Sequence, residues 1–297
     1  MTQAAVNARG VAFMLGAMAA FATSDFLVKL ATRLMPVSEI MALRGLIAVS
    51  MIGAVLARGG YGSAGAALRS PMAVLRGVIE SGVSLTIMAG LSSLPLGDCA
   101  AIPQAAPLLI TLYMVATRAE SFDPVRMAMI VVGFVGVAMV ARPSGAFQPA
   151  TLLLIAAAFL IAARDLVTRR IPRHVSSLAA TLVTTMGTTV LGASLSSVQP
   201  WILPDARGFL LLGAAAAAVT LGNLCAIAAF REAEPSVVAP FRYTIVVYAL
   251  LIGFVVWGDL PDPIAGLGIA LIVGAGVVSI LREKVRARVE KVAQIQP

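Results

Sequence analysis

The sequence predicts an all-α membrane protein in which ten transmembrane helices form two inverted five-helix repeats around a central cavity. Three observations lead to this fold class: an apolar composition, ten apolar stretches of spanning length and a repeated order of motifs. Of the 297 residues, 60% are hydrophobic and 12% are charged, and the mean hydropathy is +0.96. Soluble domains carry about 25% charged residues. This composition argues against a water-soluble globular enzyme.

The apolar stretches have the length that a bilayer requires. A hydrocarbon core about 30 Å thick needs about 20 residues of helix that rises 1.5 Å per residue. Short connections rich in Pro, Gly or charge separate the stretches and leave no room for a soluble domain. The expected spans lie near residues 10–31, 36–57, 72–93, 96–117, 124–141, 150–170, 177–198, 207–230, 236–257 and 263–281.

The distribution of Lys and Arg gives the expected orientation. With both termini in the cytoplasm, 14 of the 22 basic residues fall on the cytoplasmic side, four fall outside and four lie within spans. Short cytoplasmic loops carry such an excess. We therefore expect a multi-pass protein of a bacterial-type cytoplasmic (inner) membrane, with its basic side next to anionic lipids. The basic C-terminal stretch is interpreted as a solvated anchor, and no nucleic-acid partner is expected.

The second half of the chain repeats motifs of the first half in the same order, at an offset of about 140 residues. The matching segments are 24–29 with 164–169, 120–124 with 259–263, and 132–137 with 272–277. A unit of five spans is odd, so its second copy must enter the membrane from the opposite side. Inverted repeats of this kind are typical of transporters. We expect a first repeat at 1–145, an inverted second repeat at 146–282 and a basic cytoplasmic tail at 283–297.

The residues needed for common enzyme chemistry are missing from the sequence. There is a single histidine, His174, and the two cysteines, Cys99 and Cys225, lie far apart in apolar stretches. This pattern is neither a disulfide framework nor a set of metal ligands. No Walker motif and no G-x-G-x-x-G are present. We expect no metal, no cofactor and no enzymatic activity.

Charged residues within spans are costly, about 2.5–3.5 kcal/mol each at the bilayer centre, so each requires a partner, a cavity or access to the interface. Six of them are spaced one helical turn apart in pairs, as expected for ion pairs. The pairs are Asp25 with Lys29, Arg76 with Glu80, and Asp165 with Arg169. The simpler interpretation is an ion pair that secures a helix end. The alternative is a latch that helps to close the gate on one face of the membrane.

Polar residues near the middle of the spans are candidate substrate ligands. The set comprises Ser84, Thr86, Gln104, Asn223, Arg242 and Tyr243. Gln104 and Tyr243 are equivalent positions in the two repeats, near the pseudo-twofold axis where inverted-repeat carriers bind substrate. Arg242 is expected to attract a carboxylate. For Asn223 and Ser84, the alternative to substrate binding is a hydrogen bond between helices. For Arg242, the alternatives are an ion pair with Glu80 and a side chain that extends to the membrane interface.

Proline and glycine mark the expected bends and close contacts. Pro103, Pro107 and Pro240 lie inside spans and each removes a backbone N–H, so they are expected helix kinks. Small residues on the fifth and tenth spans permit close helix contact, either as a static spine or as a homodimer interface. These are Gly133, Gly136, Gly266, Gly268, Gly274 and Gly276.

The chain resembles the ten-helix EamA-type branch of the drug/metabolite transporter superfamily over nearly its whole length. The segments and residues that carry the resemblance are the fourth span with Pro107 closed by Glu120, the run 239–244 leading to 257–261, the first-span end from Asp25 to Lys29, and Glu39 with Arg44. Asp259 stands where the family usually has glutamate, and Val246 where a proline is expected. The resemblance implies export or exchange of small metabolites, with hydrophobic, aromatic or neutral amino acids as the leading class.

The expected function is therefore export of a small-molecule substrate by alternating access. A multidrug or cation effluxer remains the alternative, although aromatic residues, which such a cavity uses, make up only 6% of the chain. A membrane-embedded enzyme would require a cluster of acids or histidines at one interface. A channel would require a ring of identical filter residues, which two unequal repeats do not supply.

Overall fold

The computed structural model describes residues 3–59, 62–118, 123–141, 148–172, 174–197, 201–233 and 235–293. Within these ranges every regular element is a helix. Those of the first half are α1 (Gln3–Ala31), α2 (Val37–Gly59), α3 (Gly62–Arg69), α4 (Pro71–Ser93), α5 (Leu96–Ala101), η1 (Ile102–Ala105), α6 (Ala106–Ala116) and α7 (Pro124–Ala141). Those of the second half are α8 (Ala150–Thr168), α9 (Ser177–Ser196), α10 (Ala206–Glu232), α11 (Pro235–Val238), η2 (Ala239–Tyr243), α12 (Thr244–Trp257) and α13 (Pro263–Ala293).

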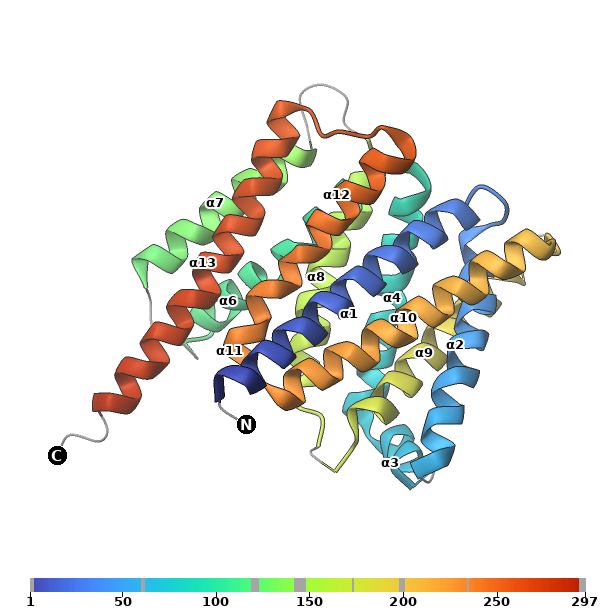
Figure 1. Ribbon diagram of the computed structural model, residues 1–297, viewed down its shortest axis with the longest axis horizontal. Coiled ribbons are helices and arrows are strands. Elements are labelled where there is room, and N and C mark those ends of the chain that lie inside the picture. Colours follow the sequence, from blue (N-terminus) through green and yellow to red (C-terminus); the bar gives the residue numbers. More distant parts are fainter. Residues whose placement is uncertain are drawn as a thin grey trace.

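The helices have the length and composition of membrane spans. Among the described residues, nine helical segments are long and apolar enough to cross a bilayer, and a shorter apolar segment, Met127–Ala141, supplies the tenth. The spans alternate in direction along the chain: α1 rises from the N-terminus in Figure 1, whereas its counterpart α8 descends. The predicted fold class is confirmed.

Helix starts follow local capping chemistry, and two helix ends differ from the expected spans. Ser70, Ser176 and Asp205 accept hydrogen bonds from backbone N–H groups at the starts of α4, α9 and α10, as N-cap residues do. Helix α1 begins at Gln3, seven residues earlier than expected. Helix α13 continues to Ala293, so most of the expected tail at 283–297 is a continuation of the last helix. Residues 294–297, like Glu120, lie outside the described residues.

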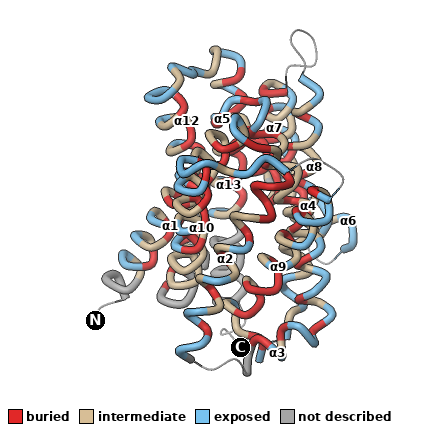
Figure 2. Tube along the Cα trace, turned by 90° about the vertical axis from the view of Figure 1, so that its right-hand side faces the viewer, coloured by how far each residue is buried: buried red, intermediate tan, exposed pale blue. Residues whose placement is uncertain are grey.

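Both described ends of the chain, Gln3 and Ala293, lie at the same end of the bundle (Figure 1). We call this the terminal end and the opposite one the distal end. A large cluster of buried apolar side chains lies toward the distal end, where α1 finishes, α4 finishes and α5 begins, and it includes Val28, Met35, Leu91 and Leu96. Figure 2 shows these buried segments inside the bundle and exposed positions on its outward faces. Many exposed side chains are large and apolar, as expected where a helix faces lipid.

The packing of the two halves follows a pseudo-twofold pattern. Helix α1 packs most extensively on α10, and its counterpart α8 packs on α4, the counterpart of α10. The helices α2 and α9, and likewise α7 and α13, pack on their own counterparts. The α7–α13 contact is close: a Cβ atom built on Gly136 would lie 2.6 Å from the Gly268 carbonyl oxygen. The expected glycine contacts therefore lie within one chain at this position.

The fourth and ninth spans are interrupted in the same way. Each consists of a short α-helix, a 3₁₀ turn and a longer α-helix: α5, η1 and α6 in the first half, and α11, η2 and α12 in the second. Pro103 and Pro240 lie at the starts of the two 3₁₀ turns, and Pro107 at the start of α6. Discontinuous spans of this kind surround the substrate site of many secondary transporters.

Candidate functional site

A partly open cavity of about 420 Å³ lies between the two halves. Its walls come from α1, α2, α4 and the broken fourth span of the first half, and from α8, α9, α10 and the broken ninth span of the second. No lining residue within the described ranges comes from α7 or α13, the pair joined by glycine contacts. The moving parts of a two-state carrier can therefore surround the cavity while this pair stays fixed.

The cavity reaches toward the terminal end of the bundle along α8 and α9, and on its other walls it extends to Met88, Cys99 and Ala100 of the distal apolar cluster. On α8 the lining residues are Ile161, Arg164 and Asp165, in the last turns of the helix, and on α9 they begin at Thr181, near the helix start. Both of those helix ends are at the terminal end (Figure 1). The apolar cluster described above occupies the distal end.

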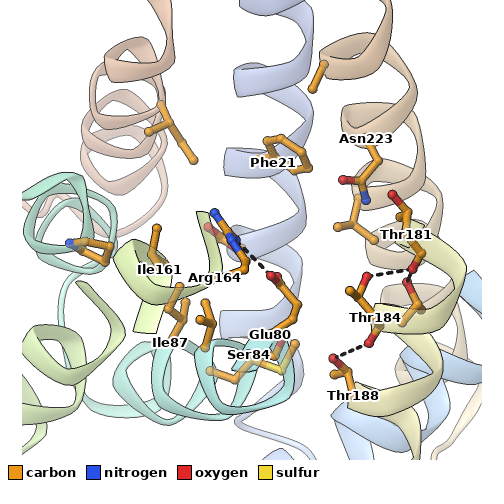
Figure 3. A pocket seen from close by; sticks show the side chains of 18 of the residues that line it. Phe21, Glu80, Ser84, Ile87, Ile161, Arg164, Thr181, Thr184, Thr188 and Asn223 are labelled. Carbon is orange, nitrogen blue, oxygen red and sulfur yellow. Dashed lines mark hydrogen bonds and ion pairs between the residues drawn. The ribbon is translucent and has the colours of Figure 1, made fainter. Parts of the chain in front are cut away.

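Arg164 holds two carboxylates of the cavity wall. Its Nη1 donates to Glu80 Oε2 at 3.0 Å, and its Nη2 donates to Asp165 Oδ1 at 2.8 Å. Figure 3 shows the first of these bonds, which joins α8 to α4. Since one guanidinium presents several donors in a fixed fork, it can satisfy both acids together. Arg76 bonds hydroxyl groups instead, those of Thr168 at 3.0 Å and Thr184 at 3.3 Å.

A second group of charges lies on α1 and α2. Arg44 Nη1 donates to Ser24 Oγ at 3.2 Å, and Ser24 Oγ donates to the Ala215 carbonyl oxygen at 3.1 Å, which connects α2, α1 and α10. Asp25 is close enough for Arg44 to act on its charge. Within the described part of the chain, however, Asp25 forms no ion pair and no hydrogen bond, and its carboxylate lines the cavity.

The ninth span supplies a fourth cation. Arg242 lies on η2 and lines the cavity, and no carboxylate among the described residues forms an ion pair with it. Gln104 on η1, Ser84 on α4 and Asn223 on α10 line the same cavity. The site therefore combines separate unpaired charges of opposite sign with amide and hydroxyl groups.

Lys29 connects three helices at the distal end. Its Nζ donates to the carbonyl oxygen of Leu91 at 3.1 Å and to that of Leu94, at the C-terminus of α4. The same ammonium lies 5.6 Å from the centroid of the Trp257 ring, and Arg33 lies 5.8 Å from it. The last carbonyls of a helix lack intrahelical partners and attract cations. Lys29 thus connects α1, α4 and α12 at that end.

The sequence of the chain matches the EamA-like transporter family twice, over residues 8–142 and over residues 148–281. The chain belongs to this family. As an EamA-family protein it is a secondary transporter of small metabolites rather than an enzyme, and it is a multi-pass membrane protein.

Two named relatives of this EamA-family chain are bacterial transporters. The S-adenosylmethionine uptake transporter of Rickettsia prowazekii (strain Madrid E) is 24% identical over 212 residues, 71% of this chain and 72% of that protein. The riboflavin transporter of Vibrio cholerae serotype O1 is 28% identical over 195 residues, 65% of each chain. A solved crystal structure shares the fold with a TM-score of 0.62 at 20% identity, covering 94% of this chain and 98% of that one.

The ion pairs of the EamA-family chain differ from those expected one turn apart. Asp165 pairs with its neighbour Arg164, whereas Arg169 is exposed beyond the end of α8. Lys29 bonds backbone carbonyls rather than Asp25. Asp165 is thus bound by the adjacent residue of its own helix, and Lys29 by the end of another helix. Neither partner lies four positions away, so the i, i+4 spacing did not identify the bonds that form.

Two expected ligands of the EamA-family site do not line the cavity. The Thr86 hydroxyl donates to the Gly82 and Val83 carbonyls of its own helix. Tyr243 is 3% exposed and packs on Gly276 of α13, and its hydroxyl has no hydrogen-bond partner in the described chain. In a 3₁₀ turn, with three residues per turn, adjacent side chains point about 120° apart. The equivalent of Gln104 that lines the cavity is therefore Arg242.

Sequence reasoning missed a row of threonines on α9. Thr181, Thr184, Thr185 and Thr188 all line the cavity of this EamA-family chain, as does Thr220 on α10. The signal was present in the sequence, because positions separated by three or four residues share one helix face. A polar row at this spacing within an apolar span indicates a face turned away from lipid.

Proposed function

We propose that the chain carries, by alternating access, a metabolite that bears an amino-acid group. The observation that carries this proposal is the pair Asp25 and Arg242: opposite charges that line one cavity, each without an ion pair among the described residues. Arg242 then binds the carboxylate of the substrate and Asp25 its ammonium group. Hydrogen bonds to charged groups contribute about 1.5–3 kcal/mol each. Two such anchors distinguish a zwitterion from a simple cation or anion.

The cavity volume supports amino acids and larger conjugates of them. Pockets that bind drug-sized ligands usually measure about 300–1,000 Å³, and this cavity of about 420 Å³ falls in that range. One relative is named as a transporter of S-adenosylmethionine, a compound whose name contains that of the amino acid methionine. Another is named as a transporter of riboflavin. A multidrug or cation effluxer is less well supported, because two of the three described carboxylates that line the cavity, Glu80 and Asp165, are already ion-paired with Arg164.

The proposed setting is a bacterial-type cytoplasmic membrane, with the terminal end of the bundle in the cytoplasm. The excess of basic residues on that side supports this orientation. The cavity then reaches toward the cytoplasm, which suits loading for export. A homodimer is not needed for this function, since one chain supplies every wall of the cavity.

Transport by purified protein in liposomes tests the proposal. Wild-type protein is loaded with an unlabelled amino acid, and accumulation of the labelled compound is measured by counterflow across a panel of amino acids and their conjugates. We expect accumulation of at least one such compound, and a loss of about tenfold or more in Arg242→Gln, with partial retention in Arg242→Lys. Asp25→Asn should reduce transport of the zwitterion but not of its N-acetyl derivative.

Arg169→Gln is the matched control, because Arg169 is exposed and away from the cavity. Unchanged transport in Arg242→Gln would remove the carboxylate role. Flux of hydrophobic cations without flux of any zwitterion would favour the effluxer instead.

A further inference from the structure

We infer that the threonine face of α9, together with Thr220 and Asn223 of α10, forms a second subsite that binds an uncharged or cationic N–H donor group of the substrate. This face is defined by Thr181, Thr184, Thr185 and Thr188. The inference rests on the proposed function, because it adds the part of the substrate beyond its amino-acid group.

Each hydroxyl of the threonine face has already used its proton. Thr181 donates to the Ser177 carbonyl at 2.9 Å, Thr184 and Thr185 donate to the Thr181 carbonyl at 2.8 and 2.9 Å, and Thr188 donates to the Thr184 carbonyl at 3.2 Å. A hydroxyl has one donor and two acceptor lone pairs. A row of hydroxyls that all donate backward along their helix therefore offers only acceptors to the cavity.

The protein itself shows which chemistry such oxygens bind. Arg76 approaches the end of the face nearest to it and donates from Nη1 to Thr184 Oγ1 at 3.3 Å, while its Nε donates to Thr168 Oγ1 at 3.0 Å. The Thr168 hydroxyl also donates to a carbonyl of its own helix, that of Arg164 at 2.7 Å. Threonine oxygens whose protons are bonded to backbone carbonyls thus accept N–H donors of a guanidinium. The oxygens of Thr185 and Thr188 remain available to a ligand.

Thr220, on the α10 wall of the cavity, supports the subsite independently. It is 4% exposed and lines the cavity, and its hydroxyl has no hydrogen-bond partner among the described residues. A buried polar group without a partner costs about 1–3 kcal/mol. Asn223, three residues later on the same helix face, also makes no hydrogen bond in the described chain. Together they can exchange donor and acceptor bonds with an amide or amino group.

The Glu80–Arg164 ion pair lies on the opposite side of the cavity from this subsite. In Figure 3, Asn223 and the labelled threonines lie on one side of the pocket, and Glu80 and Arg164 lie across from them. Helix α9 is held by close contact with α2: a Cβ atom on Gly192 would lie 2.6 Å from the Ala42 backbone nitrogen. A rigidly supported face of acceptors selects for donors more sharply than a mobile one.

L-Citrulline and L-norleucine test the subsite. Both carry the same zwitterionic amino-acid group and no net side-chain charge, but only citrulline ends in N–H donors. Binding to full-length protein in lipid nanodiscs is measured by titration calorimetry. We expect citrulline to bind at least tenfold more tightly than norleucine in the wild type. In Thr185→Val combined with Thr188→Val the preference should fall below threefold, since valine keeps the shape and removes the oxygen.

The controls separate this inference from the proposed function. Thr185→Ser with Thr188→Ser should keep the preference, and so should Thr86→Val, whose hydroxyl does not line the cavity. Equal binding of both ligands by the wild type, or an unchanged preference in the valine variant, overturns the subsite and leaves the amino-acid carrier standing. Binding of neither ligand overturns the subsite, and the counterflow panel then tests the proposed function separately.

Discussion

Arg164 is the residue on which the charge balance of the cavity depends. It is the only described cation within ion-pair distance of either Glu80 or Asp165, at 3.0 and 2.8 Å, and all three side chains are less than a third exposed. Removing one partner of a buried ion pair leaves an uncompensated charge. In a membrane protein such a charge has no alternative solvent except the water of the cavity.

We therefore expect Arg164→Met to lower the free energy of unfolding by about 3–5 kcal/mol. Thermal denaturation in detergent measures the effect. Glu80→Gln added to Arg164→Met should recover part of the loss, because it removes one of the stranded charges. Arg169→Met is the control, and its effect should stay within about 0.5 kcal/mol as for an exposed site. A larger loss for Arg169→Met than for Arg164→Met would contradict the observed pairing.

Sequence reasoning at the residue scale identified charged and polar groups but not their partners. The cost of charge in a bilayer made Asp25, Glu80, Asp165 and Arg242 conspicuous in the sequence. Their pairing depends on helix rotation and on which helices become neighbours, and neither is encoded in spacing along one helix. The clearest case is the ninth span, where Arg242 lines the cavity at the position that the repeat assigned to Tyr243. A single 3₁₀ turn decides which of these two side chains faces the cavity.

Among the elements, α1 and α4 are joined at the distal end by the Lys29 ammonium. Two backbone carbonyls of α4 and the Trp257 ring surround this group. Any state of the protein that opens the distal end must separate these contacts. Charge-assisted and cation–π interactions of this kind contribute about 1–3 kcal/mol each when partly desolvated.

Lys29→Met should therefore shift the protein toward a state that is open at the distal end. Cys99, which lines the cavity and is 5% exposed, reports on this opening in a Cys225→Ser background. We expect a membrane-impermeant maleimide added on the distal side to react with Cys99 several-fold faster in Lys29→Met. Arg33→Met, which removes only the second cation near Trp257, should have a smaller effect. Equal reactivity in all three proteins would show that Lys29 is no latch.

The α7–α13 pair depends on glycine at its crossing. A Cβ atom on Gly268 would lie 2.7 Å from the Gly136 carbonyl oxygen, whereas Gly266 and Gly274 have no atom within 4 Å of such a Cβ. Gly268→Ala should lower the melting temperature, because overpacking costs about 1–3 kcal/mol. Gly274→Ala should leave it unchanged or raise it, since alanine favours helix. The same change in both variants would contradict the close contact.

The whole molecule was predictable to the level of its architecture. Hydropathy over 20 residues is a local property, so the spans could be placed from sequence, and the odd number of spans per repeat required inversion. The cavity wall was less predictable, because a threonine such as Thr185 on α9 is inconspicuous until the helices that surround it are known. The donor and acceptor character of that wall is less predictable still, since it depends on which hydroxyl protons, such as those of the threonine face, are already used in bonds within the helix.

Accessibility of a single thiol placed in the cavity tests alternating access most directly. Ser84→Cys, with Cys99→Ser and Cys225→Ser, puts one reactive group on the α4 wall of the cavity. If the two repeats exchange conformations, an impermeant reagent should reach this thiol from either side of a sealed vesicle, and a transported amino acid should slow both reactions. A thiol that reacts from one side only, with or without substrate, would contradict a carrier built from two inverted halves.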